Sequence, residues 1–290
     1  DIAAIGLCGT SNETIPDAEK VLPKNLCPLI KSTYGFAYTE KCPYTYFSDI
    51  IIGETTCDGK KKMYELLNEL KETYILQLPQ GQNRPYAKDI WYEELKLLKE
   101  KLEEMFNVEI TDEKLREAAK MRNRLREALC DMYNLQASCP PAMTGTDVMY
   151  TLLKGSFSFD KNAYIEQIND IVAQKRKEYE EGNFSVDKSA KRILLTGCPT
   201  GGVIEKVGAV IEKNGGVIVC LDDCTGERTN KILVDENADD ILRAISDRYL
   251  SINCSVMTPN GGGLENTKNM AEKYKALDCI ECGSCSYICP

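Results

Sequence analysis

The stretch from Leu26 to Lys62, around which we expect the rest of the chain to be organised, reads LCPLIKSTYGFAYTEKCPYTYFSDIIIGETTCDGKKK. It contains Cys27, Cys42 and Cys57, with fourteen residues between each neighbouring pair. Proline follows the first two cysteines, and the third lies between a short apolar run and a helical pattern. We interpret the three side chains as thiols at strand ends and on proline-stiffened turns, positions that suit a metal site.

The cysteine count is the most informative part of the composition. The 290 residues include 14 cysteines and no histidine, with 43% hydrophobic residues. Disulfide-rich secreted proteins are normally much shorter, so the count favours metal or redox chemistry. The lack of histidine excludes Ser-His-Asp catalysis and the common zinc, haem and copper ligand sets, which leaves iron–sulfur or zinc held by thiolates. We interpret Cys8, Cys130 and Cys220 as small buried apolar residues instead.

Charge and hydropathy exclude two classes of partner. The net charge of −9 argues against nucleic acid, and no apolar run approaches the length of a membrane span. No basic leader opens the chain, and we expect a cytoplasmic protein. The chain begins with Asp1 in place of Met, so we expect that preceding residues have been removed.

Apolar periodicity predicts two α/β units joined by helices. In the first unit we expect strands at 2–8, Ile50–Gly53 and Thr73–Leu78, with helices near 16–21 and over 60–71, the latter with Asp58 as N-cap. The middle predicts helices over 86–106, 111–135 with Thr111 as N-cap, 145–153 and 161–180. The second unit predicts strands at 192–196 and 217–221 and helices over 203–213 and 238–249.

These patterns predict an α/β fold class with two Rossmann- or flavodoxin-like parallel-sheet domains and a right-handed βαβ unit in the first. We expect the domain boundaries at 1–85, 86–190, 191–275 and 276–290, the last being a ferredoxin-like cysteine motif. Cysteines recur near strand ends in the second unit, at Cys198, Cys224 and Cys254. Two such edges facing each other would enclose a buried cluster between the domains. The turn GCPTGG lacks the Lys-Ser/Thr of a P-loop, which argues against nucleotide binding there.

Four phrases carry a family resemblance: LCPLIKSTYGFAYTEKCPYTYFSDIIIGETTCDGKKKMYELL, RILLTGCPTGG, DDCTGERT and YLSINCSVMTPN. They resemble the 2-hydroxyacyl-CoA dehydratase superfamily, most closely its double-cubane cluster protein branch, to about Lys275. The resemblance implies paired α/β domains around an iron–sulfur cluster, either a double cubane or a [4Fe–4S] cluster. It also implies an anaerobic homodimer, a small-molecule substrate and a partner activator that hydrolyses ATP and supplies low-potential electrons.

The resemblance assigns six cluster ligands: Cys27, Cys42, Cys57, Cys198, Cys224 and Cys254. Of these, Cys42 and Cys198 could line the pocket rather than ligate. Groups near the cluster or substrate could be Ser32, Tyr34, Tyr44, Tyr46 and Glu54, with ordinary loop packing as the alternative for the tyrosines. No catalytic residue is identified from the sequence.

The end of the chain departs from the superfamily pattern. It reads CIECGSCSYICP and has the bacterial ferredoxin spacing C-x2-C-x2-C-x3-C-P, which predicts a second [4Fe–4S] cluster held by Cys279, Cys282, Cys285 and Cys289. We interpret the change as a junction produced by fusion or truncation. One of these cysteines could replace the late ligand that the superfamily pattern leads us to expect.

The sequence is consistent with three candidate functions. The first is a double-cubane reductase of small molecules, favoured because six candidate thiolates exceed the three that a single cubane with an open iron requires. The second is a component of a 2-hydroxyacyl-CoA dehydratase with one [4Fe–4S] cluster, which eliminates water by radical chemistry. The third is a non-catalytic scaffold that binds zinc, and cysteines at strand ends rather than in compact knuckles argue against it.

Overall fold

The computed structural model describes residues 2–7, 9, 11–197, 204–223, 225–252 and 263–276. Within these ranges the chain is mixed α/β and mostly helical, with two separate parallel sheets of two strands each. The predicted α/β chain with parallel strands is therefore confirmed. In the described residues each sheet has fewer strands than a complete Rossmann- or flavodoxin-like domain contains.

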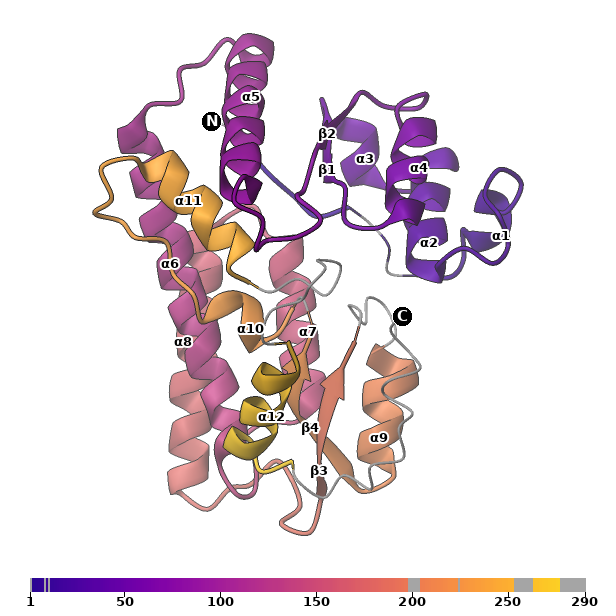
Figure 1. Cartoon of the computed structure of the whole chain (residues 1–290). Coiled ribbons are helices and arrows are strands. Elements are labelled where there is room, and N and C mark those ends of the chain that lie inside the picture. The colour runs from indigo at the N-terminus through magenta and orange to yellow at the C-terminus, as the bar shows by residue number, and fades with distance from the viewer. Residues whose placement is uncertain are drawn as a thin grey trace.

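The first sheet belongs to what we call the N-terminal unit, residues 15–76, at the upper right of Figure 1. Its elements are α1 (Ile15–Ala18), α2 (Pro28–Tyr38), α3 (Pro43–Phe47), β1 (Ile51–Glu54), α4 (Asp58–Leu67) and β2 (Thr73–Leu76). The strands β1 and β2 pair in parallel from Ile51↔Thr73 to Glu54↔Leu76, with α4 as the connection. This confirms the expected parallel strand–helix–strand arrangement.

Close packing of α4 on β1 requires a glycine in the strand. A Cβ atom on Gly53 would lie 2.3 Å from the ring of Tyr64 in α4, nearer than real Cβ atoms approach other atoms. Tyr64, Met63 and Leu67 form the buried face of α4 against Ile51. The apolar face of α4 and the absence of a side chain at Gly53 therefore set the distance between helix and sheet.

The middle of the chain forms long helices, α5 (Ala87–Phe106), α6 (Asp112–Asn134), α7 (Gly145–Ser156) and α8 (Lys161–Glu180), with a short 3-10 turn η1 (Leu135–Ala137) after α6. The predicted N-cap is confirmed, because Thr111 accepts a hydrogen bond from the backbone N–H of Lys114 at 3.3 Å. In Figure 1, α6 and α8 lie side by side, and α5 packs against α11.

The second sheet pairs β3 (Lys191–Thr196) with β4 (Gly216–Asp222) in parallel. Around it lie a wide helical turn η2 (Ile204–Ala209), α9 (Val210–Lys213), α10 (Glu227–Asn230) and α12 (Gly263–Lys273). Helix α11 (Ile241–Leu250) packs instead on α5 and α6. The largest core joins β4 to the apolar faces of α6, α7, α8 and α12. The helical middle is therefore part of the core that supports the second sheet.

Several expectations were wrong in detail. Residues 2–7 form no strand. The stretch is mostly exposed, and its one backbone bond to another described segment runs from the Gly6 N–H to the Ser156 carbonyl at 3.3 Å. Helices α2 and α3 were not predicted. The N-cap of α4 is Cys57 rather than Asp58, and the helix expected over 203–213 begins in the described residues with a wide turn.

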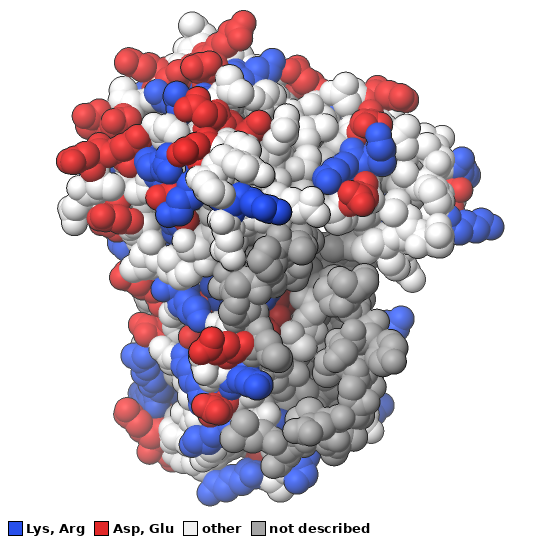
Figure 2. All heavy atoms as spheres, viewed as in Figure 1, with Lys and Arg blue, Asp and Glu red and all other residues white. Residues whose placement is uncertain are grey.

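One face of the molecule carries a cluster of acidic side chains at one end. Acidic side chains gather at the upper left of the face shown in Figure 2, over α5 and the segment before α11. Among the described residues, no helix combines the length and the apolar character that crossing a bilayer requires.

Candidate functional site

Three of the predicted ligands share one structural position, immediately before the first turn of a helix. Cys27 precedes α2, Cys42 precedes α3 and Cys57 precedes α4. Pro28 and Pro43 occupy the first helical position, where the missing N–H has no intrahelical partner to lose. Cys27 and Cys42 therefore lie at helix starts, which corrects the prediction that they occupy turns and strand ends. Only Cys57 follows a strand.

The three thiols differ in exposure. Cys27 is exposed, Cys57 is half-buried and Cys42 is buried. The Cys42 Sγ accepts a hydrogen bond from the backbone N–H of Thr45 at 3.3 Å. Free N–H groups at a helix start stabilise negative charge, and a thiolate is the form that binds metal. The placement therefore suits cysteines that act as ligands.

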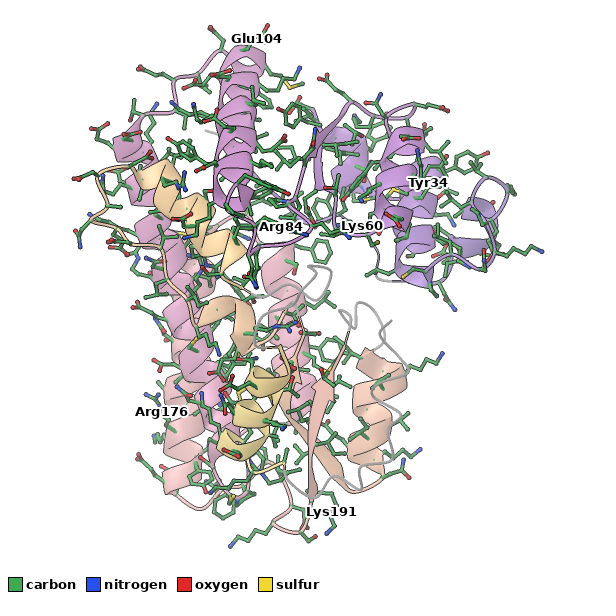
Figure 3. All side chains as sticks on the ribbon, in the orientation of Figure 1. Tyr34, Lys60, Arg84, Glu104, Arg176 and Lys191 are labelled. Carbon is green, nitrogen blue, oxygen red and sulfur yellow. The ribbon has the colours of Figure 1, made fainter. Side chains whose placement is uncertain are left out.

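The carboxyl end of β1 carries an ion pair next to Cys57. Lys60 Nζ lies 2.9 Å from Glu54 Oε1, and both side chains are partly exposed. Burial alone would lower the pKa of Lys60, but its attraction to Glu54 and Tyr64 outweighs this effect and raises the pKa. Figure 3 shows Lys60 on the side of the N-terminal unit that faces Arg84. A fixed positive charge therefore lies one turn after Cys57.

Four other groups named from the sequence make packing contacts or face solvent. The Ser32 hydroxyl donates to the Ser11 carbonyl, and the ring of Tyr34 stacks on Tyr38 in the core of the N-terminal unit. Tyr44 stacks on Phe157, with 5.3 Å between ring centroids, and Tyr46 is 58% exposed. These contacts agree with the loop-packing alternative for the tyrosines.

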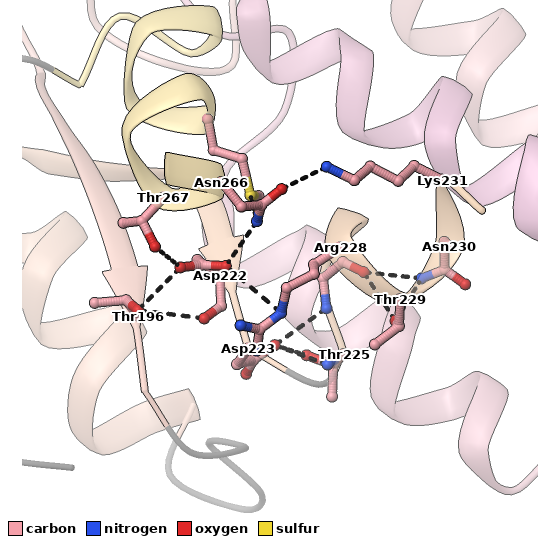
Figure 4. Close-up of polar contacts among 12 residues, drawn as sticks. Thr196, Asp222, Asp223, Thr225, Arg228, Thr229, Asn230, Lys231, Asn266 and Thr267 are labelled. Carbon is pink, nitrogen blue, oxygen red and sulfur yellow. Dashed lines mark hydrogen bonds and ion pairs between the residues drawn. The ribbon is translucent and has the colours of Figure 1, made fainter. Parts of the chain in front are cut away.

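The second sheet ends in a buried carboxylate, which sequence reasoning missed. Asp222 closes β4 opposite Thr196 of β3 and is 2% exposed. Its carboxylate accepts hydrogen bonds from the hydroxyls of Thr196 and Thr267 and from the Asn266 amide, and Arg228 Nε lies 3.8 Å away (Figure 4). The two strand ends, α10 and α12 are thereby tied to one point.

Asp223, the residue after β4, stabilises the turn that follows the strand. One carboxylate oxygen of Asp223 accepts from the N–H and hydroxyl of Thr225 and from the N–H of Gly226, at 2.7–3.1 Å (Figure 4). A side chain on Gly226 would collide with the Leu221 carbonyl, since a Cβ would lie 1.7 Å from its oxygen. The sequence signal was present in the phrase DDCTGERT, where two carboxylates end an apolar strand, but their contacts come from distant segments.

The remaining described cysteines occupy different environments. Cys130 lies within α6 and Cys220 within β4, as expected. Burial, followed by the charge of Glu227, raises the pKa of Cys130 to about 11, and burial raises the pKa of Cys220 still further. Both thiols are therefore held in the neutral form, unlike a metal ligand. Cys139 is exposed, and its Sγ lies 3.5 Å from Lys275 Nζ.

The other predicted ligands lie outside the described residues. These are Cys198, Cys224 and Cys254 and, in the tail, Cys279, Cys282, Cys285 and Cys289. Within the described ranges, no three Cys, Asp or Glu side chains are gathered as a metal site would require. The described structure therefore does not bring Cys27, Cys42 and Cys57 together as a metal-binding group. The donor chemistry fits an iron–sulfur cluster, and the set would need the cysteines of the second unit to complete it.

Two comparisons with known proteins bear on this site. The family described as 2-hydroxyglutaryl-CoA dehydratase, D-component, matches residues 1–283. The match extends past Lys275, where the resemblance was expected to end, and stops before Cys285 and Cys289. An Escherichia coli (strain K12) protein, named "Putative dehydratase subunit YjiM", is 45% identical over 271 residues, which cover 93% of this chain and 70% of that protein.

Proposed function

Because this chain belongs to the 2-hydroxyglutaryl-CoA dehydratase D-component family, we propose that it is a cluster-bearing redox enzyme that reduces small molecules. Members of this family usually carry an iron–sulfur cluster. The observation that carries the proposal is the shared position of Cys27, Cys42 and Cys57 before three consecutive helices. The half-buried thiol of Cys130 and the buried thiol of Cys220 lack this position.

The ligand set in this proposal combines both halves of the chain. Cys27, Cys42 and Cys57 bind on one side, and Cys198, Cys224 and Cys254 bind on the other. When bound, such a cluster supplies one-electron chemistry at low potential. A double cubane accounts for six thiolates better than a single cubane does. We further propose a homodimer that receives its electrons from a separate iron–sulfur activator that hydrolyses ATP.

The described residues have identifiable tasks around that site. The Thr45 N–H donates to the Cys42 sulfur, and hydrogen bonds to ligating sulfur raise the reduction potential of a cluster. Lys60 holds a positive charge beside Cys57, and its pair with Glu54 limits the net charge there. The hydrogen bonds of Asp222 with Thr196 and Thr267, which we call the Asp222 hub, fix the end of β4. They therefore also fix the point from which the chain continues toward Cys224.

A second function is favoured by the comparisons. The family description and the name of the E. coli relative both refer to a dehydratase. In that function the chain is one component of a 2-hydroxyacyl-CoA dehydratase, carries one [4Fe–4S] cluster and removes water from an acyl-CoA thioester by radical chemistry. A zinc-binding scaffold is the third candidate, and the family match argues against it.

Iron and acid-labile sulfide analysis of the anaerobically purified protein, combined with EPR spectroscopy, separates these functions. About eight irons at the main site, the content of two cubanes, are expected for the reductase. About four irons would support the dehydratase component instead. Zinc without sulfide would reject both redox functions. The tail motif is assessed separately, by repeating the analysis on a variant with Cys279 and Cys282 replaced by serine.

A further inference from the structure

A cavity of about 230 Å³ opens at the carboxyl edge of the first sheet. The last residues of β1 and β2, Glu54 and Leu76, form one wall, and helices α5, α6 and α11 form the others. Most of the lining is apolar: Leu76, Trp91, Leu95, Val234 and Ile245. Carboxyl edges of parallel strands are where ligands commonly bind, and this edge also leads to Cys57.

Two guanidinium groups line the cavity, and neither has a carboxylate partner among the described residues. Arg126 of α6 donates to the Asn123 side-chain oxygen at 2.9 Å, and Arg248 of α11 donates to the carbonyls of Ile232 and Thr229. Neither arginine lies within ion-pair distance of a carboxylate in the described part of the chain. The one acid in the cavity wall, Glu54, is paired with Lys60.

The positive charges of Arg126 and Arg248 favour a bound anion in this cavity. Burial, together with the nearby charges of Arg248 and Arg122, lowers the pKa of Arg126 to about 10. Burial also lowers the pKa of Arg248, and Arg122 adds to that effect. Partly buried like charges without counter-ions are costly, and an anion held between planar guanidinium groups offsets that cost through charge-assisted hydrogen bonds.

Trp91 provides an independent observation at the same place. The side chain is 2% exposed and stacks on Tyr249, with 4.8 Å between ring centroids. Its indole N–H is buried, and no acceptor for it is found among the described residues. Buried indole N–H groups usually find a hydrogen-bond acceptor. Trp91 therefore contributes a buried aromatic ring to the same wall as the two cationic donors.

We propose that this cavity binds a compact organic anion, a phosphate or carboxylate group on a small apolar body, with Arg126 and Arg248 as the anion-binding residues. The apolar wall receives the body of the ligand. The volume is below the range that is usual for drug-sized ligands, which suits a compact ligand. The inference does not rest on the proposed redox function, because the anion binds to protein groups alone.

The only tryptophan of the chain lies in the cavity wall, so its fluorescence reports on occupancy. The full-length protein, purified anaerobically with its native metal content, is titrated with inorganic phosphate and, separately, with butyrate at ionic strength held constant with sodium chloride. At least one anion is expected to give a saturable change in the millimolar range. Which of the two saturates assigns the ligand to phosphates or to carboxylates. No saturable change with either probe overturns the proposal.

Substitution of the arginine tests the assignment. Arg126→Gln should lower the affinity by about tenfold or more, because charge-assisted hydrogen bonds are lost. Arg124→Gln is the matched control, since Arg124 lies on the same helix, is exposed and bonds to Asn162 at 3.0 Å. Equal losses in the two variants would mean general attraction to positive charge and would overturn the proposal.

A stability measurement separates a binding role from a structural one. A residue that served only to hold the fold would lower the melting temperature when replaced. Removal of an unpaired, partly buried charge predicts that Arg126→Gln keeps or raises the melting temperature in the absence of added anion. It also predicts that phosphate or butyrate, whichever binds, raises the melting temperature of the native chain and of Arg124→Gln but not of Arg126→Gln. Arg126→Gln that unfolds without anion contradicts the assignment.

Discussion

The two sheets end in different ways, although both are parallel pairs of strands. The β1–β2 edge ends in a partly exposed ion pair, Glu54 with Lys60, in which the side chains are 28% and 30% exposed. The β3–β4 edge ends in Asp222, which is 2% exposed and contacts four side chains from other segments. The first edge therefore keeps charge accessible beside Cys57, whereas the second uses buried charge to fix the backbone.

The difference between the two edges suggests that the first serves binding and the second serves stability. A change at the first edge should affect what the protein binds, and a change at the second should affect whether the protein stays folded.

The largest effect is expected at Cys57. Cys57→Ser should lose most of the cluster iron, because a serine hydroxyl is a poor ligand for iron compared with a thiolate. The fold should persist, since serine is a favoured N-cap and α4 keeps its start. Iron analysis and circular dichroism of the anaerobically purified variant provide the measurement. Cys130→Ser is the control, and unchanged iron in Cys57→Ser would show that the ligand assignment is wrong.

The second effect concerns the buried hub of the other edge. Asp222→Ala leaves Arg228, whose side chain is 8% exposed, without its carboxylate partner. Removing one partner of a buried pair costs about 3–5 kcal/mol in the free energy of unfolding. Urea unfolding followed by circular dichroism measures the loss. A loss below about 1 kcal/mol, the scale of exposed pairs, would show that the buried Asp222 carboxylate does not hold the fold at this edge.

A third effect appears at alkaline pH. Burial raises the pKa of Tyr164 to about 12, and its hydroxyl donates to the Thr151 carbonyl at 2.8 Å. The unfolded chain ionises first, so this contribution is complete below about pH 10 and is lost as the pH rises toward about 12, on the order of 2–3 kcal/mol.

Tyr164→Phe should therefore flatten the fall in unfolding free energy between these pH values. Burial also raises the pKa of Tyr64 at the first edge, but the Lys60 charge opposes that rise. Tyr64→Phe is thus the matched comparison, and we expect it to change the pH profile less. Urea unfolding at intervals between pH 9 and 12 measures both, and a larger change in Tyr64→Phe would reverse the comparison.

The smallest effect is expected for Glu54→Gln. An exposed or partly exposed pair contributes about 0.2–1 kcal/mol, and salt screens it. The free energy of unfolding should fall by no more than that at low ionic strength, and the difference from the native chain should shrink in concentrated salt. A salt-independent loss of several kcal/mol would show that the first edge is also held by buried charge.

Much of the local structure was readable from the chain. The parallel strand–helix–strand order, the Thr111 cap and the bounds of α8, Lys161–Glu180, follow from periodicity and capping signals that act over a few residues. The helix starts after Cys27 and Cys42 were also encoded locally, since proline is favoured at the first helical position. Interpreting those prolines as turn residues hid the feature that the three thiols share.

Other features depended on contacts between distant segments. An apolar start does not make residues 2–7 a strand, because a strand needs a paired neighbour and the described fold places none there. The Asp222 hub joins positions 196, 228, 266 and 267, and the arginine-lined cavity joins α6 to α11 and the first sheet. Sequence spacing carries no signal for such groupings.

The sequence by itself determined the chemistry available to this protein: abundant thiols, no histidine and the motifs of its family. Ligand type and helix capping are properties of single residues and their close neighbours, so they can be predicted without knowledge of the fold. The tertiary structure decided which charges are buried, which remain accessible and which arginines share a cavity. Burial and charge interaction depend on distances across the chain, and only folding sets those distances.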